Sequence, residues 1–405
     1  MNHDILTDFP LLKRRINHYP LCFLDNALTT QKPYQVIEAI SHFYTMYNAT
    51  PGRSVYPLAE EATQHYENAR RKIAAFLQAK EREIIFVRGA TEGLNFIAQG
   101  WGKRHLKQGD EVVLSELEHH ANLIPWQKVV KETGAHLRFI PIDRQGLLDY
   151  GSLDSIITSR TKIVAVTQSS NAIGTIVDVN LIIKQAKQVG ARVLIDACQS
   201  APYFPINVQD MGCDFLTFSG HKMLGPTGSG VLYIKEDRFD EVDPLLLGGG
   251  SVFDVTWNQA SLRPAPEKFE AGTPSTVQAI GLAAAIDYLL TRISFSMLQS
   301  HTAKLCYQLI QGLQSIPQVT IIGPIQQLQS KGHLVTFNID KLHPHDVATY
   351  LGEKGVCLRA GNFCAQPLMQ KLGYNAAIRA SFYCYTTEED VAYTIECLRE
   401  LTNTI

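Results

Sequence analysis

Short β-rich runs alternate with helical patterns from about residue 21 to residue 233, and this alternation constrains the fold more than any other feature of the chain. The runs occupy residues 84–87, 111–114, 163–166, 193–195 and 215–218. Amphipathic helical patterns such as 60–79 and 180–188 lie between them. Strands separated by helices predict an α/β fold with a mainly parallel sheet that helices cover.

The rest of the chain follows a different pattern. A Pro- and Gly-rich passage at 246–274 is followed by a long helical pattern at 276–299. Candidate strands then occupy 335–338, 356–359 and 378–381, and candidate helices occupy 345–351 and 388–401. We therefore expect a large domain at 20–275 and a small α+β domain formed by 1–19 and 276–405, with 276–299 as the linking helix.

Composition excludes several classes of function. The 405 residues carry a formal charge of −2 and no long Lys/Arg run, so no nucleic acid or anionic membrane is indicated as a partner. Residues 1–8 contain acids and no continuous apolar region, unlike a signal peptide. The apolar stretch 280–286 is interrupted by Asp287 and is too short to span a bilayer. We expect a cytoplasmic protein.

The eight cysteines are scattered without Cys-x-x-Cys spacing, so we expect neither a metal site nor a dithiol redox site. Most fit the pattern of small buried hydrophobic residues. Cys364 differs because it lies in a short loop with Gly and Pro nearby, where we expect it to be exposed and mobile.

Two charged residues follow neighbouring β-rich runs. Asp196 follows 193–195, and Lys222 follows 215–218 within Ser219-Gly220-His221-Lys222, ahead of a glycine-rich turn at 223–230. Pyridoxal phosphate needs a lysine for a Schiff base and a carboxylate that keeps its ring nitrogen protonated. Taken singly, the lysine fits a solvated side chain and the aspartate a helix N-cap. As a pair at the carboxyl ends of strands, they predict this cofactor.

Two further segments fall at the same edge of the predicted sheet. Residues 88–93 end a strand in glycine and begin a helix, where backbone amides and the Thr91 hydroxyl bind phosphate or serve as a plain N-cap. Ser219 and His221 offer donors from the other side. In Glu118-His119-His120-Ala121-Asn122, an imidazole can stack on a pyridine ring and relay protons. Metal ligation is the rival interpretation, but adjacent histidines project in different directions.

The predicted small domain contributes cations and a thiol. Arg359 and Arg379 border strand-like runs, and a buried arginine fork binds a carboxylate, whereas a surface arginine forms salt bridges. Cys364 lies between them. An exposed thiol near cations acts as a nucleophile, and a buried one is inert.

Together these segments resemble the SufS/CsdA-like cysteine desulfurases, which are fold-type I pyridoxal-phosphate enzymes of the class V aminotransferase family, a group that includes selenocysteine lyases. The resemblance runs nearly end to end and is carried by residues 23–27, 31–33, 60–63, 118–127, 170–175, 219–222 and 269–274. It implies a large domain with a mainly parallel seven-stranded sheet and a homodimer.

The resemblance also implies a role for each candidate residue. Lys222 holds the cofactor, Asp196 pairs with its ring nitrogen, Gln199 with its ring oxygen, and His119 stacks on the ring. The phosphate is held by Thr91, Ser219 and His221, with Thr273 reaching over from a second subunit. Asn171 and Arg379 bind the substrate carboxylate, with Arg359 close by.

The implied reaction converts L-cysteine to L-alanine. Cys364 takes the sulfur as a persulfide and passes it to an acceptor protein for iron–sulfur cluster assembly. The short segment from Arg359 to Cys364 is similar to the type II subgroup, for which a SufE- or SufU-like acceptor is expected.

The chain departs from the family pattern near the nucleophile. Ala360, Asn362 and Phe363 stand where the family shows Ser or Thr, His or Gln, and His, so Cys364 lacks an imidazole directly before it. Ala90 replaces a common threonine, and residues 48–53 differ near the substrate entrance. Two alternatives follow. One is a selenocysteine lyase, acting on L-selenocysteine, or another C–S lyase that does not require Cys364. The other is a homologue without turnover that binds sulfur-transfer proteins.

Overall fold

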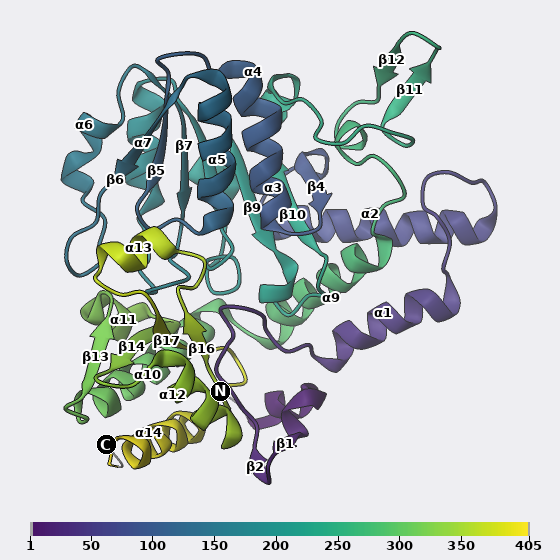
Figure 1. The fold of residues 1–405 in the computed structure, drawn as a ribbon. Coiled ribbons are helices and arrows are strands. Elements are labelled where there is room, and N and C mark those ends of the chain that lie inside the picture. Colours follow the sequence, from purple (N-terminus) through teal and green to yellow (C-terminus); the bar gives the residue numbers. More distant parts are fainter. Residues whose placement is uncertain (1–2, 404–405) are drawn as a thin grey trace.

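The structure, a computed structural model, describes residues 3–403 and is built around a seven-stranded sheet (Figure 1). The first two and last two residues of the predicted small domain lie outside the described part. The strand order is β4-β10-β9-β8-β7-β5-β6. The strands are β4 (Ile84–Val87), β5 (Glu111–Ser115), β6 (His136–Ile140), β7 (Thr161–Thr167), β8 (Arg192–Asp196), β9 (Phe215–Ser219) and β10 (Gly230–Ile234). Strand β10 runs antiparallel to both β4 and β9, and all other strand pairs are parallel, so the predicted mainly parallel seven-stranded sheet is confirmed.

Helices cover both faces of this sheet because successive strand side chains point to opposite faces. In β5, Val112 packs in the same cluster as Trp126 of α5, whereas Val113 packs in the cluster that contains Ile182 of α7. The central strands β5 and β9 are buried along their whole length on both faces, which explains their apolar runs. The helices of this part are α1 (Tyr34–Met46), α2 (Pro57–Leu77), α3 (Ala90–Ile97), α4 (Lys103–His105), α5 (His120–Thr133), α6 (Leu153–Ile156), α7 (Val179–Gln188) and α8 (Val208–Met211).

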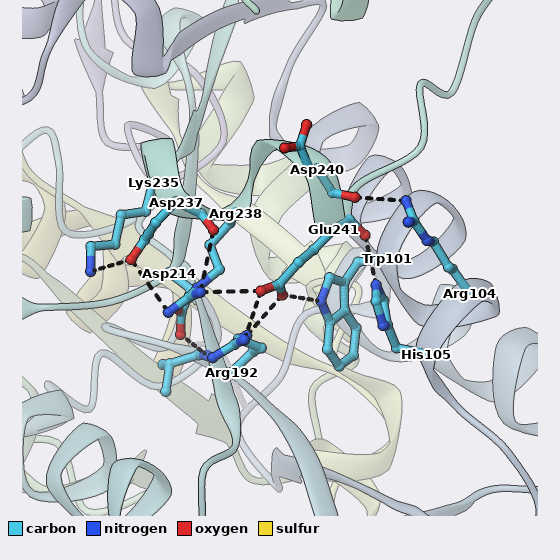
Figure 2. A network of polar contacts seen from close by, with 11 residues as sticks. Trp101, Arg104, His105, Arg192, Asp214, Lys235, Asp237, Arg238, Asp240 and Glu241 are labelled. Carbon is cyan, nitrogen blue, oxygen red and sulfur yellow. Dashed lines mark hydrogen bonds and ion pairs between the residues drawn. The ribbon is translucent and has the colours of Figure 1, made fainter.

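A polar network closes the amino-terminal edge of the sheet (Figure 2). The Glu241 carboxylate accepts from the Arg192 guanidinium at 2.7 and 2.9 Å and from the Trp101 indole at 3.2 Å. Arg238 donates to Glu241 at 3.1 Å and to Asp214 at 2.7 Å. Arg192 begins β8 and Asp214 directly precedes β9, so this network fixes the ends of the strands that lie opposite Asp196 and Ser219.

A second, smaller sheet has the order β13-β14-β17-β16. Its strands are β13 (Val319–Ile322), β14 (Leu334–Ile339), β16 (Arg359–Gly361) and β17 (Ala377–Ser381), all antiparallel. The helices of this region are α10 (Phe295–Gln314), α11 (Ile325–Lys331), α12 (Pro344–Glu353), α13 (Gln366–Lys371) and α14 (Glu388–Thr402). Helix α13 lies between this sheet and the larger one (Figure 1). A capping box between Thr387 and Asp390 begins α14.

Short pairs of strands complete the fold. The β3 strand (Cys22–Phe23) runs parallel to β15 (Val356–Cys357), and Leu24 packs in the core of the smaller sheet. The pair β1 (Arg15–Ile16) and β2 (Tyr19–Pro20) lies near the start of the described chain. The hairpin formed by β11 (Val252–Val255) and β12 (Ala260–Leu262) projects from the body of the molecule (Figure 1).

The helix predicted at 276–299 is two helices. Helix α9 (Thr276–Arg292) ends at Ile293, which has extended backbone and is buried, and α10 begins after Ser294, which is also extended. Serine favours such non-helical positions at the start of a helix. Within residues 3–403, no single helix is long and apolar enough to cross a membrane, and α9 and α10 reach that length and composition only together, across a bend of 83°.

Candidate active site

Neighbouring strand ends bring most of the predicted site residues together. Strands β8 and β9 are adjacent, so Asp196 and Ser219 end side by side, and a 3-10 turn over Gly220–Lys222 follows Ser219. A cavity of about 190 Å³ opens at this edge. The predicted residues in its wall are Thr91, His119, Asn171, Asp196, Gln199, Ser219, His221 and Lys222.

Asp196 and Gln199 are held rigidly in the buried part of the wall. The Asp196 Oδ1 atom accepts from the Cys198 amide at 2.9 Å, which fixes the carboxylate. The Gln199 side-chain nitrogen donates to the Ala27 carbonyl at 2.7 Å. Burial and the Asp196 charge raise the pKa of the Cys198 thiol to about 12, so this cavity thiol stays protonated.

The amino terminus of α3 meets Ser219. The Ala90 amide donates to Ser219 Oγ at 2.9 Å, so the Ser219 hydroxyl hydrogen is left for another acceptor. A hollow that continues from the cavity is lined by Gly89, Thr91, Ser219 and His221. Helix-start amides with hydroxyl donors form an anion site, so this end of the cavity suits a phosphate.

His119 presents a neutral imidazole to the cavity. It caps α5, and its Nδ1 atom accepts from the Ala121 amide at 3.0 Å, which assigns the ring hydrogen to Nε2. Burial and the neighbouring Lys222 lower the pKa of His119 to about 4. The His120 ring lies 6.3 Å away at 52° and turns to the loop of Cys364. Within residues 3–403, no group of three or more His, Cys, Asp or Glu side chains is placed to hold a metal ion.

The peptide before Lys222 is clamped by residues that the sequence reasoning did not assign to the site. The His221 carbonyl accepts from Thr30 N at 3.0 Å, Thr29 Oγ1 at 3.1 Å and Lys32 Nζ at 2.9 Å. Burial lowers the pKa of Lys32 to about 7. Lys32 and His221 are 189 residues apart in the sequence, so no local sequence pattern predicts their contact.

Arg379 contacts Asn171, a residue of the cavity wall. The Arg379 side chain is 3% exposed and donates to the Asn171 carbonyl at 2.6 Å and to Asp25 Oδ1 at 3.1 Å. Asp25 was also absent from the predicted site, although it lies within the resembling segment 23–27. Burial raises the pKa of its carboxyl, against the opposing effect of Arg379. Arg359 is the direct cross-strand neighbour of Arg379, but it is exposed and does not line the cavity.

Cys364 is the exposed cysteine of the chain, as expected, and its loop is anchored. The His120 amide donates to the Cys364 carbonyl at 2.7 Å, and the Gln366 amide donates to His120 Nε2 at 3.1 Å. The Cys364 amide donates to Asn362 Oδ1 at 3.1 Å. The loop is thus fastened to the residue next to His119. Its predicted mobility stays a prediction.

Thr273 is exposed and does not line the cavity of its own chain. The loop before it is held by Arg53, which donates to the Gly249 carbonyl at 3.1 Å and to the Gly272 carbonyl at 2.7 Å. The divergent segment 48–53 therefore supports the backbone next to Thr273.

Comparison with known proteins decides the family. The chain matches the family "Aminotransferase class-V" over residues 22–393. The chain belongs to this family. A probable cysteine desulfurase from Halalkalibacterium halodurans is 44% identical over 395 residues, covering 96% of this chain and 95% of that protein. A cysteine desulfurase from Enterobacter sp. is 42% identical, with coverages of 98% and 97%.

Solved structures of cysteine desulfurases have the same fold as this chain. The apo cysteine desulfurase of Thermococcus onnurineus has a TM-score of 0.95 and 39% identity, covering 100% of this chain and 99% of that one. The Escherichia coli cysteine desulfurase CsdA has a TM-score of 0.92 and 36% identity at the same coverages. The expected fold-type I architecture and the resemblance to cysteine desulfurases are confirmed.

Proposed function

We propose that this class V aminotransferase is a cytoplasmic, pyridoxal-phosphate-dependent cysteine desulfurase that converts L-cysteine to L-alanine. The observation that carries the proposal is the placement of Cys364: its loop is hydrogen-bonded to His120, next to the His119 ring that faces the cavity of Lys222 and Asp196. The start of α5 thus ties the loop of the exposed thiol to the wall of the cavity that contains Lys222.

The residues in the cavity fit pyridoxal phosphate. An amine and a buried carboxylate share the cavity with the flat His119 imidazole, and the adjoining hollow offers amide and hydroxyl donors suited to a phosphate. Lys222, Asp196, Gln199 and His119 would hold the ring, and Thr91, Ser219 and His221 the phosphate. When bound, the cofactor supplies an electron sink that stabilises negative charge at the substrate α-carbon.

The chain's own residues divide the remaining tasks. Asn171 and Arg379 orient the substrate carboxylate through charge-assisted hydrogen bonds. The Lys222 amine, once free, takes the proton from the α-carbon. Cys364 Sγ bonds to the substrate sulfur while the carbon–sulfur bond breaks, which leaves a persulfide on Cys364 and, after a proton returns to carbon, alanine.

Exposure of Cys364 supports transfer of the persulfide to a separate acceptor, which we propose to be a SufE- or SufU-like protein serving iron–sulfur cluster assembly. Exposure of Thr273 supports a homodimer in which this residue reaches the phosphate of a second copy. Arg359, exposed beside Arg379, is proposed to assist at the substrate entrance.

The test is substitution of the nucleophile. Cys364→Ala should keep the absorbance of the bound cofactor and lose release of alanine and sulfide from cysteine, because only the sulfur-accepting atom is removed. Cys357→Ala, at a half-buried position on β15, is the matched control and should keep activity. Full activity of Cys364→Ala would overturn the nucleophile assignment.

One observation favours a second candidate function. Phe363 precedes Cys364, and the imidazole of His120 accepts from the Gln366 amide, so neither of these two residues offers the thiol a free imidazole. A selenocysteine lyase or another C–S lyase does not depend on that thiol. Turnover of L-selenocysteine by Cys364→Ala, without turnover of L-cysteine, would favour this alternative.

A further inference from the structure

Phe363 is buried although it lies in the loop between β16 and α13. The residue is 6% exposed, and both Phe363 and Cys364 adopt positive φ, at 56° and 54°. Left-handed backbone is costly for a bulky residue, so surrounding contacts must hold it in place. Those contacts lead to the carboxylate side of the site.

The Phe363 ring covers the guanidinium of Arg379. The Arg379 Cζ atom lies 5.0 Å from the ring centroid, within the range of a cation–π contact. Two nitrogens of this guanidinium donate to Asn171 and Asp25, and its Nε atom is buried without a partner within residues 3–403. A buried, unpaired N–H costs free energy, so an acceptor supplied by a ligand would complete the hydrogen bonding of this guanidinium.

The main chain of Phe363 contacts the other proposed carboxylate ligand. The Asn171 side-chain nitrogen donates to the Phe363 carbonyl at 2.7 Å. The residue directly before the nucleophile therefore touches both groups that would bind the substrate carboxylate.

We propose that Phe363 is a positioning residue for the substrate carboxylate: its ring fixes the guanidinium plane of Arg379 and shields it from water. This inference rests on the proposed function, which assigns the carboxylate to Arg379 and Asn171. It also explains how the chain places both ends of its substrate. Phe363 organises the carboxylate end, and Cys364, its neighbour, meets the sulfur.

The experiment uses the cofactor-loaded enzyme and compares two ligands that differ only by a carboxylate. L-Alanine and ethylamine are titrated while the absorbance of the bound cofactor is followed, which gives Kd without turnover. Phe363→Leu keeps an apolar side chain but removes the ring. It should weaken L-alanine binding by about fivefold to thirtyfold, the value of a partly desolvated cation–π contact, and leave ethylamine binding unchanged.

Two further variants sharpen the result. Phe363→Tyr should restore L-alanine binding because it restores the ring. Lys354 Nζ lies 5.1 Å from the ring centroid of Tyr350, which is on α12. Tyr350→Leu removes this contact and should change the Kd of neither ligand. In steady state, Phe363→Leu should raise KM for L-cysteine more than it lowers kcat. Should Phe363→Leu fail to fold, Phe363→Met serves, since it also lacks a ring.

The outcomes separate this proposal from the proposed function. Equal or tighter L-alanine binding by Phe363→Leu overturns the role of Phe363, and so does equal weakening for ethylamine. If the wild-type enzyme forms no alanine from cysteine, the desulfurase proposal fails, while the paired titrations still decide whether the ring supports carboxylate binding.

Discussion

Glu270→Ala should lower the free energy of unfolding by about 3–5 kcal/mol, because it leaves the buried Arg70 charged without its partner. The two side chains form a bidentate pair, with both distances at 2.9 Å. Their side chains are 3% and 10% exposed. The pair joins α2 to the segment that leads to Thr273.

Other contacts of Glu270 set where in this range the loss should fall. Its Oε1 atom also accepts from the Phe86 amide at 2.8 Å, and its Oε2 atom accepts from the Tyr66 hydroxyl at 3.0 Å. Removal of the carboxylate leaves these donors, as well as the guanidinium, without this acceptor, so a loss in the upper half of the range is expected. Arg70 keeps two partners, the Ile84 carbonyl at 2.6 Å and the Glu67 carboxylate at 3.1 Å, which limits the loss of stability.

The assay is urea denaturation of cofactor-free protein, followed by far-ultraviolet circular dichroism, because bound ligand would add its own stabilisation. Glu67→Ala is the matched control. Glu67 lies 3.1 Å from the same arginine, but its side chain is 44% exposed, so its loss should cost less than about 1 kcal/mol. The double change of Arg70→Met with Glu270→Leu should cost less than Glu270→Ala alone, because no unpaired charge remains.

The reasoning would be refuted if Glu270→Ala destabilised the protein no more than Glu67→Ala does. It would also be refuted if replacing Arg70 as well as Glu270 lowered the stability below that of Glu270→Ala by as much as an independent substitution of Arg70 would. Either result would mean that the buried charge is compensated by something other than Glu270.

Two further predictions concern the edge of the sheet. Burial raises the pKa of Glu118 from 4.5 to about 7. Between pH 4.5 and about 7 the folded protein therefore keeps a proton on Glu118 that the unfolded chain has lost. The free energy of unfolding should fall by roughly 3 kcal/mol as the pH rises through this range. Urea denaturation at pH 4.5 and at about pH 7 should show this fall in the wild type. The same fall in Glu118→Gln would mean that another group causes it. Gly230→Ala should destabilise the protein by more than about 1 kcal/mol, because the new Cβ would lie 2.5 Å from the Gly89 Cα, whereas Gly248→Ala meets nothing within 4 Å. Equal melting temperatures of these two variants would contradict the contact.

The sequence predicted the cavity well because parallel strands end at one edge of a sheet. Asp196, Ser219 and Lys222 follow strands β8 and β9, so their meeting depends only on local order and on strand adjacency. Asp25 and Lys32 were not predicted because their partners, Arg379 and His221, lie 354 and 189 residues away in the sequence. Long-range contacts of this kind leave no periodic signal.

Two other differences have local causes that the sequence pattern conceals. The helical spacing of apolar residues in 276–299 continues through Ile293, so the sequence pattern does not reveal the break between α9 and α10. The break depends on how each helix packs in the folded protein. Phe363 was identified only as the absence of a histidine. Its contact with Arg379 depends on a positive φ that no residue preference indicates.

The contact between Asp25 and Arg379 has a consequence for synthesis on the ribosome. The seven-stranded sheet draws only on residues 84–234, so it can form while the rest of the chain is still being made. Arg379 cannot meet Asp25, nor β15 meet β3, until almost the entire chain has left the ribosomal tunnel. A nascent chain should therefore form the cavity walls around Asp196 and Lys222 well before it forms the contact of Arg379 with Asp25.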